Sequence, residues 1–276
     1  MARHAKTLRL LDVAIATLKA SHPMTVRQVY YQLVSRQVIE NTRSAYQTVS
    51  NLLVDARKEG IIPWDWIEDR LRRPRLVPMW ADLSDFAATA RNSYRRNVWT
   101  SQPDFIEVWL EKDALSGVFE DVLEVYGVTL NVGRGYDGWD SIRNAAQRYL
   151  AAGDVTVLYF GDFDPSGEDM VRSLQERLAF FECHPQIVKC ALTRDDVARY
   201  DLPPALTKST DTRRNAFVDK YGDISVEIDA LPVDVLRNRI IAEVEKRMDL
   251  AALEEVRLAQ EKERAALVVA LRKLFQ

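Results

Sequence analysis

Apolar and polar residues follow two different periods along this chain, and the change of period divides it into two parts. In the first part, apolar residues recur at every third or fourth position, which is typical of amphipathic helices. This spacing predicts helices over residues 7–19, after Thr25 and after Thr42, because both threonines can cap the helix that follows. Gly60 is expected to end the third helix.

A short apolar segment and a group of arginines follow these three helices. Residues 61–67 are predicted to form a short strand and wing. The arginines behind them are Arg70, Arg72, Arg73 and Arg75. Three helices with a basic β-tip are typical of a winged helix-turn-helix domain, which we expect over residues 1–76. Its third helix would enter a DNA groove, where Arg43, Gln47 and Ser50 would meet bases or phosphates. The alternative is a three-helix module that binds another protein.

Prolines mark the end of this first part. Pro74 and Pro78 indicate a linker, which we place at residues 77–104. Within the linker, residues 85–98 are predicted to form one connecting helix, since apolar positions again follow a helical spacing. The second domain would therefore span residues 105–276.

From residue 105 the pattern changes to short, continuous apolar runs that alternate with helical segments. The predicted strands cover residues 105–111, 128–132, 155–160 and 186–192. The predicted helices cover residues 114–126 and 141–152, and a third helix begins near Ser166. Strands and helices in this order build a parallel sheet between helices, so we expect a protein of the α/β class.

The last part of the chain is predicted to be mostly helical. Residues 225–228 are expected to add one more strand, and helices follow over residues 232–248 and 250–275. The final helix is long, charged and amphipathic. It fits a dimer or partner surface as well as it fits packing on its own domain.

Carboxylates follow two of the predicted strands at the point where each strand ends. Glu111 closes the first strand of the second domain, and Asp162 and Asp164 follow the third strand. Because parallel strands end at one edge of a sheet, the three side chains should converge. Mg²⁺ prefers such oxygen ligands together with waters and phosphate oxygens, so we predict a Mg²⁺ site, with Mn²⁺ as a substitute. The alternative is a loop whose aspartates only cap the next helix.

Two further carboxylates lie downstream, in the predicted strand and just after it. Glu227 and Asp229 could add to the acidic site or lie on the wet face of that strand, and the wet face is the favoured interpretation.

Charge is distributed unevenly along the 276 residues. Residues 1–100 hold 16 Lys and Arg against 9 Asp and Glu, a charge of +7, whereas the remainder holds 22 against 32, a charge of −10. A basic N-terminal part joined to an acidic C-terminal part fits a nucleic-acid-binding domain attached to a metal-binding domain.

Other classes of protein are disfavoured by the composition. No apolar run reaches the roughly 18 residues of a membrane span, and we expect neither a membrane segment nor a secretory leader. The two cysteines, Cys183 and Cys190, cannot build a four-cysteine zinc module, which disfavours a primase. They fit a reduced, cytoplasmic protein, and binding to DNA would place it at the nucleoid.

The ordered motifs of the second domain resemble a Toprim domain. They are Glu111 followed by a helix, Gly-Arg-Gly-Tyr at residues 133–136 and Gly-Asp-Phe-Asp-Pro-Ser-Gly at residues 161–167. More narrowly, they resemble the A subunit of type IIB DNA topoisomerases (topoisomerase VI) and its meiotic double-strand-break relatives. The segment Arg27-Gln28-Val29-Tyr30-Tyr31 is similar to the Arg-x-aliphatic-aromatic-Tyr motif that this family carries on a winged helix.

The resemblance implies roles for individual residues. Tyr31 would be the nucleophile that attacks a DNA phosphodiester and stays joined to the 5′ end, with Arg27 one helical turn away as a source of positive charge. Asp162 and Asp164 would hold Mg²⁺, and Glu111 would be a further ligand or the acid/base of the transesterification. Arg134 would join the residues that contact DNA.

The resemblance also implies partners. Double-stranded DNA would be the substrate, a homodimer would place each tyrosine beside the partner's acidic site, and a separate ATP-binding B-type subunit would complete a topoisomerase. Asp137 and Gly138 replace a usual Pro-Asp, and Ser166 stands where His is common, which puts the finer substrate contacts in question.

Two alternatives remain beside this type IIB topoisomerase-like transesterase (an isomerase). One is a Toprim nuclease that cuts DNA with metal-activated water, in which Tyr31 is structural. The other is a DNA-binding or assembly protein without catalytic activity. A phosphatase of the Asp-x-Asp type is less favoured, because its aspartate pair normally follows the first strand of the domain.

Overall fold

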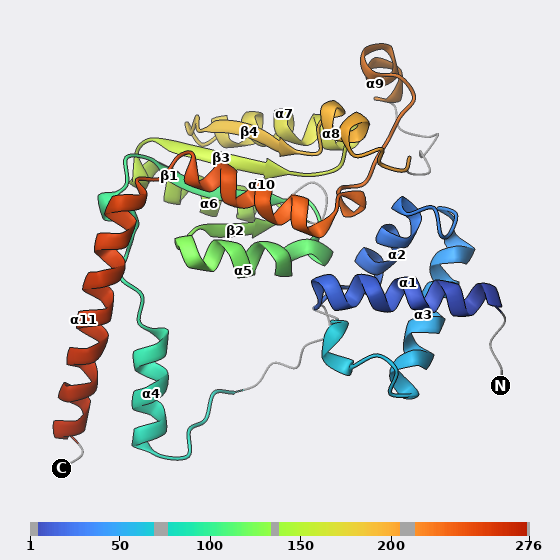
Figure 1. The fold of residues 1–276 in the computed structure, drawn as a ribbon. Helices are drawn as coiled ribbons and strands as arrows, with labels where there is room; N and C mark the ends of the chain where they lie inside the picture. Colours follow the sequence, from blue (N-terminus) through green and yellow to red (C-terminus); the bar gives the residue numbers. More distant parts are fainter. Residues whose placement is uncertain (1–4, 69–76, 134–137, 205–212, 275–276) are drawn as a thin grey trace.

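A four-stranded parallel sheet forms the centre of the molecule and confirms the α/β class (Figure 1). The computed structural model describes residues 5–68, 77–133, 138–204 and 213–274. The strands lie in the order β2-β1-β3-β4. Their bounds are β1 (Phe105–Leu110), β2 (Thr129–Val132), β3 (Val155–Phe160) and β4 (Gln186–Ala191). All neighbouring pairs run parallel, as the alternation of strands and helices predicts.

Helices cover both faces of this sheet. On one face, α5 (Ser116–Tyr126) and α10 (Val233–Glu245) pack against Val108, Leu158 and Phe160. On the other face, α6 (Trp139–Ala152) and α7 (Pro165–Ala179) pack against Trp109, Val157 and Tyr159. Every residue of β3 is buried, which explains why its sequence is a continuous apolar run rather than an alternating one.

One charged side chain lies in the middle of the sheet. Glu107 on β1 is fully buried and accepts hydrogen bonds from Arg148 at 2.6 and 2.9 Å and from the Tyr149 hydroxyl at 2.8 Å. Asn131 also donates to it. A buried charge is tolerated when it is paired and hydrogen-bonded in this way, so the network allows a carboxylate inside the sheet.

Three helices precede the sheet, as predicted. They are α1 (Ala5–Ser21), α2 (Val26–Ser35) and α3 (Arg43–Lys58). Thr25 and Gln28 form a reciprocal capping box at the start of α2, and Thr42 caps α3 by accepting from the amide of Ala45.

Two predicted strands are wrong. Residues 61–67 contain a short 3₁₀ helix, η1 (Trp64–Trp66), and a single bridge between Met24 and Ile67 instead of a strand. Pro63 has no amide hydrogen to donate, and its carbonyl accepts from Trp66, which closes a turn. Residues 225–228 make one antiparallel bridge, between Phe163 and Val226, and then turn into the 3₁₀ helix η5 (Ile228–Ala230).

The N-terminal helices pack directly on the α/β part of the same chain. Helix α2 contacts η5 and the 3₁₀ helix η4 (Asp113–Leu115) that follows β1. The Gln32 amide donates to the carbonyl oxygen of Leu231 at 3.4 Å. Buried side chains of both parts form one continuous hydrophobic cluster.

The segment between the two parts runs beside the end of the chain. Helix α4 (Leu83–Ser93) lies along α11 (Leu250–Leu274), and Figure 1 shows the pair extending away from the sheet. The Tyr94 hydroxyl donates to Glu263 at 2.5 Å, and Arg264 donates to the Tyr94 carbonyl at 2.8 Å. Helix α4 is shorter than predicted, because the backbone becomes extended at Tyr94.

Short helices complete the fold. They are η3 (Trp99–Ser101), α8 (Arg194–Arg199) and α9 (Arg214–Tyr221). Within the residues that the structure describes, none of the helices has both the length and the apolar character needed to cross a bilayer.

Candidate active site at the carboxyl edge of the sheet

The carboxylates predicted at the ends of two strands meet at one edge of the sheet. Glu111 follows β1, Asp162 follows β3, and these two strands are neighbours. The Asp162 backbone amide donates to Glu111 Oε2 at 2.9 Å, and the Tyr159 hydroxyl lies 3.4 Å from the same oxygen. The Glu111 carboxylate is therefore held in place by the backbone of Asp162.

Asp164 takes part in the start of the next helix. Its Oδ1 accepts from the amide of Gly167 at 2.6 Å and so caps α7, while Pro165 occupies the first helical position. The helix-cap interpretation is thus correct for one oxygen of Asp164. In addition, the N-terminus of α7 is directed toward the acidic edge, which favours a negatively charged ligand there.

Two glycines allow this edge to pack closely. A side chain at Gly161 would put its Cβ 2.5 Å from Glu111 Oε2 and 2.7 Å from the Tyr159 ring. A side chain at Gly167 would overlap the carbonyl oxygen of Asp162. The glycines of the motif at 161–167 are therefore required by space at the carboxylates.

Lys112 gathers three carboxylates around one ammonium group. Its Nζ lies 3.0 Å from Asp162 Oδ2, 2.7 Å from Glu227 Oε2 and 3.0 Å from Asp229 Oδ2. The other oxygen of Asp162 accepts from the amide of Ile228 at 2.8 Å. Asp162 thus joins strand β3 to the segment that carries the other two acids.

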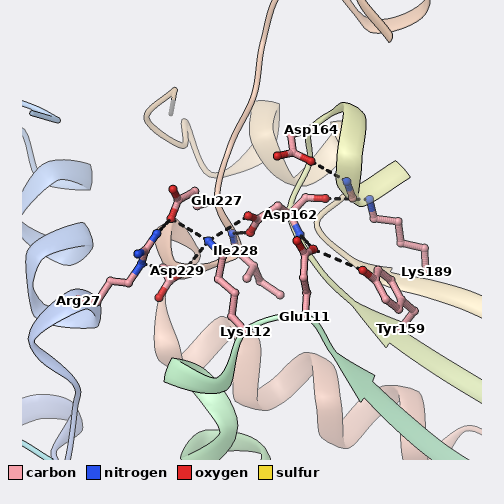
Figure 2. A network of polar contacts seen from close by, with 11 residues as sticks. Arg27, Glu111, Lys112, Tyr159, Asp162, Asp164, Lys189, Glu227, Ile228 and Asp229 are labelled. Atoms are coloured by element: carbon pink, nitrogen blue, oxygen red, sulfur yellow. Dashed lines mark hydrogen bonds and ion pairs between the residues drawn. The ribbon is translucent and has the colours of Figure 1, made fainter. Parts of the chain in front are cut away.

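The predicted position of Glu227 and Asp229 on the wet face of a strand is wrong, because the segment forms a 3₁₀ turn in which Asp229 is buried and Glu227 half-buried. The turn at η5 directs both of them to Lys112, and the Asp229 side chain is fully buried. Arg27, from α2, pairs with Glu227 and lies 3.6 Å from Asp229. Figure 2 shows these ion pairs running from Arg27 through Lys112 to Asp162.

The pKa values reflect this crowding of charge. Burial raises the pKa of Glu111, and the nearby charge of Asp164 adds to the rise. Burial also raises the pKa of Asp162 to about 7, although Lys112 opposes the change. For Glu227 the balance is reversed: burial is outweighed by Lys112 and Arg27, which lower its pKa to about 2.

Tyr31 meets the same cluster from the N-terminal side. It is only 6% exposed, and its ring lies 5.6 Å from the guanidinium carbon of Arg27. Burial, followed by the Glu227 charge, raises the pKa of Tyr31 above its usual value. Tyr31 lines a cavity of about 210 Å³, and Arg27, Arg43 and Glu227 line it too.

Tyr30 has a different environment from its neighbour. Its hydroxyl lies 3.0 Å from Asn41 Oδ1 and donates to the carbonyl of Thr42 at 3.1 Å. It therefore anchors the turn that leads into α3, and of the two adjacent tyrosines it is Tyr31 that lies next to the ion pairs.

The other predicted DNA contacts are divided between the surface and the undescribed segments. On α3, Arg43 and Gln47 are exposed and Ser50 is half-buried, with Gln47 donating to Asn51 at 3.0 Å. The remaining predictions fall outside the described residues. They are Arg70, Arg72, Arg73 and Arg134.

Two lysines of the site were not predicted from the sequence. Lys112 directly follows Glu111, and this adjacency is the one feature of the sequence that could have indicated its place in the site. Lys189, on β4, donates to the carbonyl of Asp162 at 3.0 Å and to Glu168 at 2.6 Å. Nothing in the apolar run around Lys189 distinguishes it from a solvent-facing strand residue.

The donor set at this edge suits a hard cation such as Mg²⁺. Among the described residues, no side chain or backbone group forms a hydrogen bond or ion pair with Glu111 Oε1 or Asp164 Oδ2. Within the described residues no three His, Cys, Asp or Glu side chains form a ready-made metal group. Mg²⁺ needs only one or two carboxylates when phosphate oxygens and water supply the rest, so the residues fit.

Comparison with known proteins leaves the family open. No model of a known protein family matches this chain, and no curated protein is significantly similar to it. The fold and the site define an α/β protein with an acidic sheet edge, to which a tyrosine-bearing helix is ion-paired.

Proposed function

We propose that this protein is a Mg²⁺-dependent DNA strand-breaking transesterase in which Tyr31 becomes joined to a 5′ phosphate. The observation that carries the proposal is the contact between the helix of Tyr31 and the acidic edge of the sheet. Arg27, whose guanidinium carbon lies 5.6 Å from the Tyr31 ring, pairs with Glu227, and Glu227 shares Lys112 with Asp162. The candidate nucleophile therefore lies beside a polar network that leads from Arg27 to the candidate metal site.

The residues divide the chemistry between them. Glu111 and Asp164 would hold Mg²⁺ through the oxygens that accept no hydrogen bond from the described residues, and Asp162 would complete the acidic edge. The ion, when bound, would stabilise charge on the phosphodiester and the leaving oxygen. Arg27 and Arg43 line the cavity beside Tyr31, and their guanidinium groups suit a phosphate. Lys189 would place a further positive charge near the backbone of Asp162.

The finer assignments belong to the same proposal. We assign the first three helices to a winged-helix DNA-binding unit and the sheet to a Toprim-type domain, with double-stranded DNA as the substrate. The exposed Arg43 and Gln47 on α3 support the first assignment, and the strand order with carboxylates at two adjacent strand ends supports the second. A homodimer, a B-type ATPase partner and a nucleoid location remain proposals of the same kind.

The test is transfer of a DNA label to the protein. Wild type, Tyr31→Phe and Tyr30→Phe are incubated with 5′- or 3′-labelled duplex DNA and Mg²⁺ or Mn²⁺, and the products are denatured. We expect a covalent adduct with wild type and with Tyr30→Phe, and none with Tyr31→Phe. Tyr30→Phe is the matched control because it removes a hydroxyl from the adjacent residue.

Label transfer also depends on the end that carries the label. A 5′ phosphotyrosyl link leaves the strand on the 3′ side of the break attached to the protein, so a 3′ label follows the protein. An adduct that persists in Tyr31→Phe would exclude Tyr31 as the nucleophile, whereas DNA binding without cleavage under either metal would favour an assembly protein.

A hydrolytic nuclease is the second candidate. It is favoured by the burial of Tyr31 and by the nearby charge of Glu227, both of which raise the pKa of the phenol and so keep it protonated. That reading predicts cleavage without an adduct, free 5′ phosphates, and activity that survives Tyr31→Phe.

A further inference from the structure

The residue between the two aspartates of the motif at 161–167 is held by aromatic side chains of α9. Phe163 is only 2% exposed. Its ring centroid lies 5.2 Å from that of Phe217 and 5.3 Å from that of Tyr221, and the last two centroids are 5.1 Å apart. Aromatic pairs at these distances stabilise each other beyond the burial of their surface. The cluster therefore fixes the direction of the Phe163 side chain.

The backbone of the same residue is paired with the segment that follows α9. The Phe163 amide donates to the carbonyl of Val226 at 2.9 Å, and the Val226 amide donates back to the Phe163 carbonyl at 2.9 Å. Two residues later, the amide of Ile228 donates to Asp162 Oδ1 at 2.8 Å. The chain from α9 to η5 thus contacts the aspartate motif through a ring, through the backbone and through one carboxylate.

Helix α9 is also joined to the helix that Asp164 caps. The Tyr221 hydroxyl donates to Glu168 at 3.2 Å, and Arg213 donates to Asp169 at 2.7 Å. Both acids lie near the start of α7. The loop between β3 and α7 is therefore supported on its apolar side by the Phe163 contacts and at its far end by these polar contacts.

The two aspartates depend on this support because they flank Phe163 directly in the sequence. A rotation of the backbone at Phe163 would displace both carboxylates. Mg²⁺ accepts little displacement, since it requires nearly octahedral geometry with oxygens at about 2.0–2.1 Å. Groups that only orient metal ligands change metal affinity by about 10- to 100-fold when they are removed.

We propose that Phe217 and Tyr221 are positioning residues for the metal site, and that they act through Phe163 on the carboxylates of Asp162 and Asp164. This inference rests on the proposed function, to which it adds α9, a helix that lies outside the sheet motifs. The part of the two rings is to hold the loop that carries the ligands.

Binding of Mn²⁺ in the absence of DNA tests the proposal. The ion is titrated into each protein and the free ion is followed by electron paramagnetic resonance, so the result does not depend on cleavage. We expect Phe217→Leu and Tyr221→Leu to weaken Mn²⁺ binding by about 10- to 100-fold. Tyr221 is only half-buried, so Tyr221→Leu keeps the test decisive even if Phe217→Leu fails to fold.

Two control variants separate positioning from a general loss of stability. Tyr221→Phe keeps the ring and removes only the hydroxyl that donates to Glu168, so it should bind Mn²⁺ like wild type. Phe181→Leu makes the same aromatic-to-leucine change beyond the other end of α7, next to Phe180 and Trp139. It should lower the unfolding temperature without changing Mn²⁺ affinity.

The outcomes distinguish the inference from the proposed function. Unchanged Mn²⁺ affinity in Phe217→Leu and Tyr221→Leu, or equal weakening in Phe181→Leu, would overturn the inference and leave the proposed function intact. A wild-type protein that binds no Mn²⁺ would overturn both.

A second readout is the dependence of adduct formation on metal concentration. Tyr221→Leu should need about 10- to 100-fold more Mn²⁺ than wild type for half-maximal adduct, because the ligands are less well placed. At saturating Mn²⁺ its adduct yield should return to the wild-type level. A reduced yield that no concentration of Mn²⁺ restores would contradict a positioning role.

Discussion

Lys112 controls the charge of the acidic edge. Its ammonium group is the shared partner of Asp162, Glu227 and Asp229, and Asp229 is fully buried. A buried carboxylate without a partner is costly, because the protein interior solvates its charge poorly. Lys112 therefore stabilises the fold in addition to shaping the site.

Removing this lysine should destabilise the protein strongly. Lys112→Met keeps most of the volume but leaves Asp229 buried with only the more distant Arg27, and we expect a loss of about 3–5 kcal/mol of unfolding free energy. Lys262→Met, on the exposed surface of α11, is the control and should change stability by less than about 0.5 kcal/mol. Urea unfolding measures both, and an equal effect of the two substitutions would contradict the role of Lys112.

Glu227 should make stability depend on pH. Folding lowers the pKa of this carboxyl from 4.5 to about 2. The ionised carboxylate therefore stabilises the fold above pH 4.5, and this stabilisation is lost as the pH falls toward 2. The difference in unfolding free energy between wild type and Glu227→Gln should be about 3 kcal/mol near neutral pH. It should shrink between pH 4.5 and 2. A difference that does not vary over this range would show that Glu227 is not held ionised.

At the scale of elements, Asp164 shows how one residue can serve two purposes. One oxygen caps α7, and the other accepts no hydrogen bond from the described residues, so the proposed function assigns it to Mg²⁺. The sequence alone could support either interpretation, because Asp is favoured in both settings.

Two substitutions separate these purposes. Asp164→Ala should lower the unfolding free energy by about 1 kcal/mol through loss of the cap, while Asp164→Asn should stay within a few tenths. Both should abolish metal-dependent cleavage. Thermal unfolding with a parallel cleavage assay distinguishes the effects, and an active Asp164→Asn protein would remove Asp164 from the metal site.

The elements themselves were largely predictable from the sequence. The sequence pattern is clearest at Val155–Phe160, where the strand is buried on both faces and its sequence is therefore a continuous apolar run. The positions of Glu111 and Asp162 at one sheet edge followed from topology alone. The two short segments were not predictable, because residues 61–67 and 225–228 both have apolar, strand-like sequences. In the first segment a proline produces a turn. In the second, the backbone amide of Ile228 donates to Asp162 and the chain turns there.

At the scale of the whole molecule, the central feature is the docking of α2 on the acidic edge. No sequence pattern predicted it, because Arg27 and Glu227 are 200 positions apart and each is unremarkable locally. The docking places the N-terminal helices and the sheet in one cooperative hydrophobic cluster.

Weakening this docking should be visible as local opening. Arg27→Ala removes the ion pairs to Glu227 and Asp229, so amide hydrogen exchange should become faster in α2 and around η5 while α6 is unchanged. Arg95→Ala, which breaks the exposed pair with Glu124 and exposed hydrogen bonds to the carbonyls of Asn92 and Tyr94, should leave all three regions as they are. Exchange measured by mass spectrometry would contradict the account if α2 were equally protected in Arg27→Ala.

The most direct measurement is to identify the residue that carries DNA. A covalent complex formed with Mg²⁺ is digested with nuclease and trypsin, and the modified peptide is fragmented in a mass spectrometer. We predict a nucleotide on the peptide Gln-Val-Tyr-Tyr-Gln-Leu-Val-Ser-Arg, at residues 28–36, with the added mass on Tyr31 and none on Tyr30. A nucleotide on any other residue, or cleaved DNA with an unmodified peptide, would contradict the claim that Tyr31 breaks the strand.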